Sequence, residues 1–193
     1  ETIFQEALKQ IELQKNNKYF IVYKSNWHHG VLGIVASKIV SLYNKPAFVL
    51  SFSNNIGIGS GRSIDLIDIG GIILELKNNN LILDGGGHKM AVGLRINFNQ
   101  IEGFKKFLNS KFSSYRNNLF EKTVHYDSQL SVNQINNEFL NLIEKMEPYG
   151  KGNDEPQFLI KDIRIEKINI LKNKHLLIFF KNDLGDNLRG ISF

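Results

Sequence analysis

A strand, a helix and a second strand in succession near the N-terminus most constrain the fold of this chain. Residues 19–23 form a short apolar run that is typical of a buried strand, and residues 31–43 have helical periodicity that stops before Pro46. Residues 47–52 predict the second strand. Strands joined through a helix lie parallel with a right-handed crossover, so we expect an α/β domain with a mixed, mostly parallel sheet.

Helical and glycine-rich segments alternate through the rest of this first domain. Residues 67–76 predict a helix, and residues 94–98 predict an edge strand. Asn99 is placed to cap a further helix. The apolar face of that helix would hold Ile101, Phe104, Phe107 and Leu108. We assign the domain to residues 18–116 and interpret the amphipathic residues 1–17 as a linker helix.

A second, smaller domain is expected at residues 120–193. Polar residues 113–118 mark the boundary, since linkers are exposed and poor in apolar side chains. A short strand is predicted near Val124, and Ser131 with Gln134 forms a capping box for a helix. Strand-like segments follow at residues 157–170, 175–180 and 188–193. This pattern predicts a small antiparallel sheet or barrel.

The charge of the chain favours a polyanionic partner. Its 193 residues carry a formal net charge of +5, and basic groups that neutralise phosphates release condensed counterions. The absence of cysteine excludes disulfides, thiolate nucleophiles and cysteine-bound zinc. No apolar run approaches the roughly 20 residues that cross a bilayer. We therefore expect a cytoplasmic protein that binds no membrane.

The first glycine-rich motif, GIGSGRS at residues 57–63, has the residue types of a phosphate-binding site. Glycines let backbone amides approach a ligand closely, and a guanidinium can hold a phosphate through two hydrogen bonds. The candidate residues are Gly59, Ser60, Gly61, Arg62 and Ser63. The alternative is a glycine-rich turn with a solvated arginine, since short glycine-rich strings are common.

The second motif, GGGH at residues 85–88, places three glycines before an imidazole. His88 could donate to a phosphate oxygen, act as a base or ligate a metal, and Gly86 and Gly87 leave the backbone beside it unshielded. The alternative is a structural histidine that follows a turn. Two such motifs in one α/β domain favour a binding site, because ligands lie where strands and helices end in these domains.

Two histidines lie between the first strand and the helix after it. Adjacent residues of an extended segment point to opposite sides, so His28 and His29 are poorly placed to share a metal. We take His29 as the candidate, because a helix N-terminus favours an anion. Trp27, the only tryptophan, is expected to anchor the core rather than to stack on a base.

The sequence offers no metal site of its own. Asp65, Asp68 and Asp84 lie near the motifs but lack an accompanying pattern of ligands. Hydrolysis of a phosphodiester without metal ligands is difficult. This chain alone is therefore not expected to be a complete enzyme.

Three segments resemble, in the same order, the DHH-associated domain of RecJ-type exonucleases: WHHGVLGIVASKIVSLYNKPAFVLS, GSGRSIDLIDIG and GGGHKMAVGL. The second domain resembles the RecJ OB domain through EPYGKGNDEPQF, KNKHLLIFF and LRGISF. The resemblance covers nearly the entire chain. It implies an α/β DHH-associated domain followed by a small OB-like β-barrel, which we expect to be truncated because the chain ends within a strand pattern.

By this resemblance, the chain is part of an enzyme that degrades single-stranded DNA from 5′ to 3′ in recombination and repair. Members of the family bind Mn²⁺ or Mg²⁺ in a DHH domain that is absent here, so we expect no cofactor in this fragment and no activity from it alone. Ser60, Arg62 and Ser63 would bind DNA phosphates. His88 and the two glycines before it would face the scissile phosphate across an interdomain cleft.

The resemblance also implies that the OB-like domain binds the strand through a basic groove and aromatic platforms. Lys151, Arg164, His175 and Phe179 are the candidate contacts. The sequence leaves open which face of this sheet meets DNA. Single-stranded DNA is the implied partner, together with a helicase or single-strand-binding protein, and we expect a monomer.

Two other functions stay open. One is a phosphodiesterase of small nucleotides, either oligoribonucleotides or cyclic dinucleotides, and the other is a non-catalytic nucleic-acid-binding module. A small-nucleotide enzyme would bind dinucleotides tightly with little dependence on strand length. A protein that threads DNA would gain affinity with strand length and lose it with salt.

Overall fold

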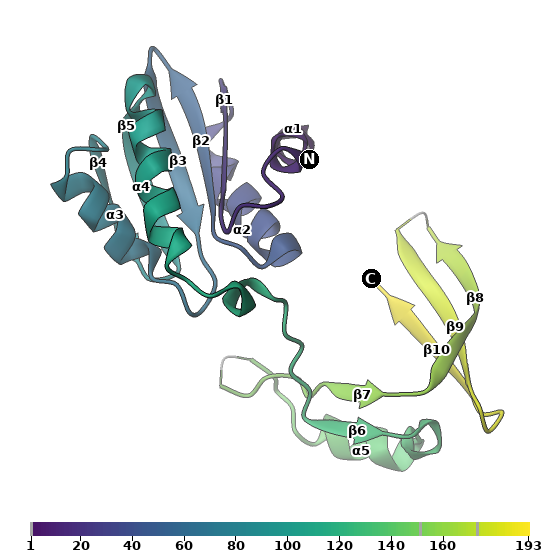
Figure 1. Ribbon diagram of the computed structural model, residues 1–193. Helices are drawn as coiled ribbons and strands as arrows, with labels where there is room; N and C mark the ends of the chain where they lie inside the picture. The colour runs from purple at the N-terminus through teal and green to yellow at the C-terminus, as the bar shows by residue number, and fades with distance from the viewer. Residues whose placement is uncertain (1, 151, 173) are drawn as a thin grey trace. The chain divides into compact units, whose positions relative to one another are not determined.

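The computed structural model describes residues 2–150, 152–172 and 174–193 (Figure 1). The chain divides into two compact units, residues 1–122 and residues 123–193. In the described part of the chain, no helix is long and apolar enough to cross a membrane.

A five-stranded mixed sheet forms the centre of the first unit. Its strands lie in the order β1 (Phe20–Ser25), β2 (Ala47–Ser53), β3 (Ile56–Arg62), β5 (Ala91–Asn97) and β4 (Asp84–His88). The mixed sheet and the parallel β1–β2 pair confirm the prediction. The expected parallel majority is wrong, because β3 pairs antiparallel with β2 and β5, and β5 pairs antiparallel with β4.

Short turns explain why most pairings are antiparallel. Only Asn54 and Asn55 join β2 to β3, and both have positive φ values, 48° and 63°. Two-residue hairpin turns need this left-handed conformation, which asparagine tolerates. A tight hairpin also joins β4 to β5. As a result β5 lies between β3 and β4, and the edge position expected for residues 94–98 is wrong.

Helices cover both faces of this sheet (Figure 1). On one face, α1 (Thr2–Glu12) and α2 (Leu32–Tyr43) pack against a core that includes Phe20 and Val49. On the other, α3 (Ile69–Asn78) and α4 (Ile101–Ser113) pack against a core that includes Phe48 and Leu50. A 3₁₀ turn, Phe98–Gln100, leads into α4, and Asn97 with Gln100 forms its capping box instead of the expected Asn99 cap.

The first helix, expected as a linker, packs on the first unit. Its Ala7 and Ile11 are fully buried. Trp27 is 5% exposed and its Nε1 donates to the Glu6 carboxylate at 2.7 Å. The structure therefore confirms that the tryptophan anchors the core.

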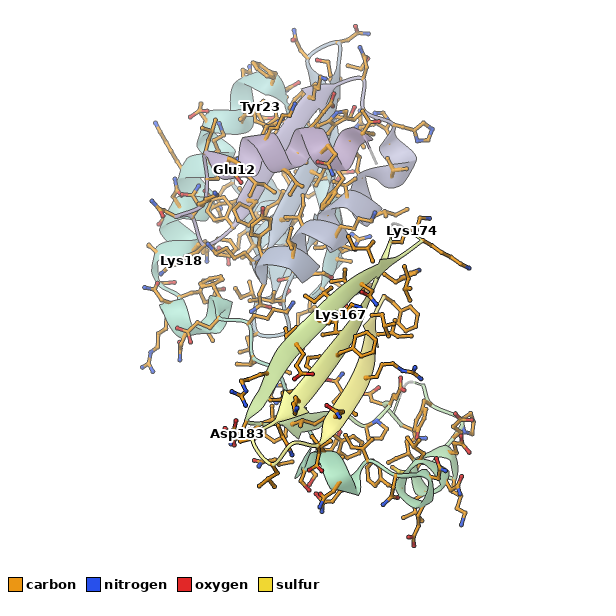
Figure 2. All side chains as sticks on the ribbon, turned by 90° about the vertical axis from the view of Figure 1, so that its right-hand side faces the viewer. Glu12, Lys18, Tyr23, Lys167, Lys174 and Asp183 are labelled. Carbon is orange, nitrogen blue, oxygen red and sulfur yellow. The ribbon has the colours of Figure 1, made fainter. Side chains whose placement is uncertain are left out.

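Two glutamines protect the edge strand β1. Gln10 of α1 donates to the Tyr23 carbonyl at 2.9 Å and accepts from the Tyr23 N–H at 3.0 Å. Gln14, in the turn after α1, makes the same pair of bonds with Ile21, at 2.8 and 3.1 Å. The two side-chain amides thus replace a neighbouring strand, which satisfies backbone groups that an edge otherwise leaves open. Figure 2 shows α1, with Glu12 near its end, crossing beside Tyr23.

The second unit contains two small sheets. A parallel pair joins β6 (Ser128–Leu130) to β7 (Phe158–Ile160), and the antiparallel sheet has the order β10 (Asn187–Ser192), β9 (His175–Asn182), β8 (Ile163–Leu171). The antiparallel sheet confirms the prediction, while a closed barrel is not formed by the described residues. The strand expected near Val124 begins only at β6.

Local breaks account for the remaining differences in this unit. Asp162, with φ 55°, separates β7 from β8, where one strand was expected. The predicted capping box of Ser131 and Gln134 is present, but it caps a 3₁₀ turn, Val132–Gln134. The helix that follows, α5 (Asn137–Glu144), is capped by Asn136 instead.

Candidate nucleic-acid interface

Ser60, Gly93 and Gly86 form a row across β3, β5 and β4, and we call this row the glycine lane. The three are direct Cα partners in the sheet. Ser60 also pairs with Val49, whose side chain lies on the face of α1 and α2. Directly paired residues share a face, so the lane lies on the side of the sheet away from α3 and α4. Both lane glycines are exposed and Ser60 is partly exposed.

The lane is open because its glycines have no side chains to fill it. A Cβ built on Gly86 would meet no atom within 4 Å, and one on Gly93 would meet only the Gly59 carbonyl, at 4.0 Å. Internal packing therefore does not require glycine at either position. The absent side chains leave bare backbone that a ligand can approach closely.

The glycines of the first motif have a different role. A Cβ on Gly59 would lie 2.5 Å from Leu50, and one on Gly61 would lie 2.7 Å from Val92 and 2.8 Å from Phe48. Both glycines face the core with α3 and α4, and they make room for large side chains of β2 and β5. Gly59 and Gly61 are buried, so their alpha carbons do not face the lane.

Charged and apolar rows border the lane. Ile58, Arg95 and Asp84 are Cα partners on one side of it, and Arg62, Ala91 and His88 are Cα partners on the other. A shallow depression of about 460 Å³ lies between the first of these rows and the lane. It is lined by Ile58, Gly59, Asp84, Gly85, Gly86, Gly93, Leu94 and Arg95.

The Arg62 guanidinium packs against Gly33 of α2. A Cβ on Gly33 would lie 2.7 Å from Arg62 Nη2 and 3.3 Å from its Cζ, so the guanidinium packs directly against this glycine. Arg62 Nη1 also donates to the Gly61 carbonyl at 2.8 Å. A guanidinium has five N–H donors, which leaves Arg62 with donors for an anion beside the lane.

His88 ends β4 and is exposed. Gly87 before it has φ 148°, a conformation that other residues rarely adopt, and a Cβ there would collide with the Ala91 carbonyl. Gly87 therefore shapes the tight hairpin that presents His88, whereas Gly86 contributes open surface. The sequence motif GGGH thus combines two structural roles.

Two other candidates lie away from the lane. Ser63 is 4% exposed, and its hydroxyl donates to the Ile67 carbonyl at 2.7 Å. His29 is exposed in the 3₁₀ turn His29–Val31 that precedes α2. The His28 Nδ1 accepts from the Gly30 N–H at 3.2 Å, so His28 stabilises this turn.

Around the lane, positive charge exceeds negative charge. The Asp84 carboxylate is the acidic group in the flanking rows, and its pKa is lowered by a hydrogen bond from Lys77, by the Gly85 N–H and by the Lys77 charge. It is therefore ionised near neutral pH and paired with Lys77 at 2.7 Å. Arg62 makes no ion pair among the described residues, whereas Arg95 lies opposite Asp84 and its charge also lowers the pKa of that carboxylate.

Within the described ranges, no three His, Asp or Glu side chains gather in a way that could hold a metal ion. The residues present therefore do not fit a metal site.

The second unit has one apolar and one basic sheet face. With Glu166 in a bulge between Ile165 and Lys167, the register places most of the large apolar residues on one face. Its members are Ile163, Ile165, Ile168, Ile170, Leu176, Ile178, Phe180 and Leu188. The opposite face, which we call the basic face, carries Arg164, Lys167, Phe179, Lys181 and Arg189, together with the aliphatic residues Leu171, Leu177 and Ile191.

Phe179 is the centre of the basic face. Its direct partners across the sheet are Lys167 on β8 and Arg189 on β10. Arg164 pairs with Asp183 at 3.0 Å and Lys181 with Glu166 at 3.7 Å. Among the residues that the structure describes, Lys167 and Arg189 have no ion-pair partner. Figure 2 shows Lys167 along its strand and Asp183 at the β9–β10 turn.

The candidates named for this unit fall partly on that face. Arg164 and Phe179 belong to it, and His175 lies on the same side at the far end of β9, with its ring 5.3 Å from that of Phe193. Lys151 lies outside the described residues. The sequence reasoning missed Gly93, Arg95, Lys167 and Arg189. These four residues are recognised as part of each surface only from their strand partners. The sequence alone does not show which strands pair, so it could not identify them.

Comparison with known proteins agrees with both units. The DHHA1 domain family matches residues 16–114, and the RecJ OB domain family matches residues 126–193. The single-stranded-DNA-specific exonuclease RecJ of Haemophilus influenzae is 32% identical over 141 residues, which is 71% of this chain and 24% of that protein. RecJ of Bacillus subtilis is 28% identical over 184 residues, which is 92% of this chain and 23% of that protein.

A solved structure has the same fold over most of the chain. RecJ of Thermus thermophilus in complex with Mn²⁺ matches with a TM-score of 0.70 and 25% identity. The match covers 92% of this chain and 26% of that one. The chain thus spans about a quarter of the length of these relatives.

Proposed function

Because the chain belongs to the DHHA1 family and carries the DHHA1 and OB domains of a RecJ-type exonuclease, we propose that it holds single-stranded DNA for 5′-3′ degradation in recombination and repair. The open glycine lane beside Arg62 is the observation that carries this proposal. A flat strip of bare backbone can admit a sugar-phosphate chain, and an arginine next to it can bind a phosphate.

The lane residues receive separate roles in this proposal. Ser60 and Arg62 bind phosphates of the strand, and the bare backbone of Gly86 and Gly93 lets the strand approach. His88 donates a hydrogen bond to an oxygen of the phosphate that is to be cleaved. The expected cradle of Gly59, Gly61 and Ser63 is not proposed as a direct contact, since these residues are buried.

The basic face of the second unit provides the second contact. Phe179 serves as a stacking platform for a base, and Lys167 and Arg189 on either side bind phosphates. Arg164 and Lys181 add positive charge near one end. Such contacts tolerate any sequence, because every base has a π face and every nucleotide a phosphate.

We propose that the metal ion of the reaction binds outside this chain. The described residues hold no ligand set for a cation, whereas the related Thermus thermophilus structures contain Mn²⁺ or Mg²⁺. We propose that the complete exonuclease would bind Mn²⁺ or Mg²⁺ in a DHH domain, and that the ion would there supply an activated water for hydrolysis. The chain described here positions the strand and neutralises its charge.

Fluorescence anisotropy of this chain with labelled DNA tests the proposal. Single strands with a 5′-phosphate or a 5′-hydroxyl are compared with duplex DNA for the wild type, for Arg62→Ala and for the exposed control Arg116→Ala. We expect preference for single strands and a loss of about tenfold in affinity for Arg62→Ala, the factor that corresponds to 1.4 kcal/mol. The control should stay within about twofold.

The same assay separates the alternatives. Competition by dinucleotides as strong as that by longer strands, with no salt dependence, would favour a small-nucleotide phosphodiesterase. Equal binding of single and double strands with a silent Arg62→Ala would contradict the proposal. Affinity that rises with strand length and falls with salt supports it.

A further inference from the structure

A short segment that follows Arg62 contacts the hairpin that carries His88 at three successive points. This segment, residues 63–70, runs from the end of β3 into the first turn of α3. The hairpin turn contains Lys89 and Met90 between β4 and β5. Both chain segments belong to the first unit, so their contacts are internal to one compact body.

Two backbone hydrogen bonds fasten the hairpin turn. The Ser63 N–H donates to the Met90 carbonyl at 3.0 Å, and the Ile69 N–H donates to the Lys89 carbonyl at 3.2 Å. The Ser63 hydroxyl in turn donates to the Ile67 carbonyl at 2.7 Å. This bond lies in the buried interior, since Ser63 is 4% exposed and Ile67 is fully buried. Ser63 therefore shapes the segment that reaches the turn.

Gly70 supplies the third contact through its missing side chain. A Cβ on Gly70 would lie 2.9 Å from the His88 carbonyl carbon and 3.0 Å from its oxygen. Both are backbone atoms, so they cannot move aside as a flexible side chain does. The first turn of α3 therefore packs directly against the backbone of His88, and only glycine permits that approach.

The neighbouring Gly71 provides a matched comparison. A Cβ there would lie 3.3 Å from the Asp68 carboxylate and would meet no atom of the hairpin within 4 Å. A Cβ on Gly70 would crowd the same carboxylate almost equally, at 3.2 Å. Both glycines occupy the first turn of α3, so alanine at either position gives a similar gain in helix propensity. They differ in the contact with His88.

We propose that Ser63 and Gly70 are positioning residues that hold His88 at a fixed place relative to Arg62. Ser63 directly follows Arg62 in the chain, so each end of the 63–70 segment is tied to one of the two groups. Two groups that act on one phosphodiester must keep their separation, and a misplacement of about 1 Å can cost about a hundredfold in rate. This inference rests on the proposed role of the lane in binding DNA.

The experiment compares Gly70→Ala with Gly71→Ala in this chain, with Ser63→Ala as a second variant. The first readout is NMR: the chemical shifts of the Lys89, Met90 and Ala91 amides and of the His88 imidazole, which is assigned through His88→Gln. The second readout is the affinity for 5′-phosphorylated single-stranded DNA. Trp27 fluorescence, which reports on the core of the first unit, shows that each variant is folded.

Gly70→Ala is expected to shift the three amide signals and the His88 imidazole signal and to weaken DNA binding about tenfold, while Gly71→Ala changes binding less than about twofold. Ser63→Ala should shift the same signals less strongly. Equal shifts from both glycine variants, or none from Gly70→Ala, would overturn the proposal. Shifts in the hairpin without any change in DNA affinity would support the positioning contact and contradict the role of His88 in binding.

Discussion

The two units of the chain differ in how they bury apolar groups and in how they present charge. Among the residues that the structure describes, all buried apolar ones except Val132 belong to the first unit. In the second, Ile165, Ile168 and Ile170 are 57%, 49% and 69% exposed. The first unit presents the bare backbone of Gly86 and Gly93 on its sheet, and the second presents Lys167 and Arg189 on either side of the Phe179 ring. We infer that the first sets the geometry of a bound strand and the second provides affinity through charge.

The largest difference is expected in stability. Phe104 is fully buried and packs edge-on against Phe48, with ring centroids 5.5 Å apart. Phe104→Ala should lower the free energy of unfolding of the first unit by about 3–5 kcal/mol, because it leaves a cavity. Ile170→Ala, at an exposed position of the second unit, should cost less than about 1 kcal/mol. Chemical denaturation followed by Trp27 fluorescence and circular dichroism measures both. Similar losses of free energy of unfolding for Phe104→Ala and Ile170→Ala would contradict the difference in packing between the two units.

Gln10 and Gln14, which bond to the edge of β1, should stabilise the first unit and not the second. Gln10→Ala leaves the Tyr23 N–H and carbonyl without partners and should cost about 1–3 kcal/mol. Gln5→Ala in the same helix is the control, since Gln5 is exposed. The same denaturation experiment applies. Equal free energies of unfolding for the two variants would mean that water satisfies the Tyr23 N–H and carbonyl once Gln10 is replaced.

The salt dependence of DNA binding tests the inference that the second unit provides affinity through charge. Replacing Lys167 and Arg189 together by glutamine should lower the affinity for single-stranded DNA about tenfold and reduce the salt slope by about 1.4, or about 0.7 for each phosphate contact. The control replaces Lys9 and Lys106, two exposed lysines of the first unit. Binding isotherms at several salt concentrations give the slopes. Equal slope changes in both variants would mean that net charge, not the basic face, attracts DNA.

The smallest expected effect is a pH dependence of the first unit. Hydrogen bonds from Lys24 and then Trp27 lower the pKa of Glu6 below 4.5. A lowered carboxylate pKa stabilises the fold above the unfolded-state pKa, about 4.3, and this contribution is lost as the pH falls through the folded-state pKa. Glu6→Gln should therefore reduce the decline of the Trp27 transition between about pH 5 and pH 3. Gln5→Ala, at an exposed uncharged position of the same helix, should leave that decline unchanged.

The sequence predicted the elements that depend on local patterns. The β1–α2–β2 succession, α4 and the three strands of the antiparallel sheet follow from periodicity and turn residues. Strand direction and edge position could not be predicted, because they depend on pairing between distant segments. The two-residue turn at Asn54 and Asn55 makes β3 antiparallel to β2, a direction that was not predicted from the sequence.

The candidate site was predicted as a set of motifs rather than as a surface. Within the motifs, residue type alone does not separate Gly61, which faces Phe48, from Gly86, which faces open space. Period-two alternation makes that distinction, but only for a segment known to be a strand. The structure places Arg62 beside the open backbone of the lane, whereas the Ser63 hydroxyl points into the buried interior.

The central claim is that the glycine lane holds a single strand of DNA, and Gly86→Val tests it most directly. The protein has space for the new side chain, and valine favours strands, so the Trp27 unfolding midpoint should not fall. Gly103→Ala in α4, on the other face of the sheet, is the control. Anisotropy with 5′-phosphorylated single-stranded DNA should show a loss of about tenfold or more for Gly86→Val and almost none for the control. Full binding by a stably folded Gly86→Val protein would contradict the account.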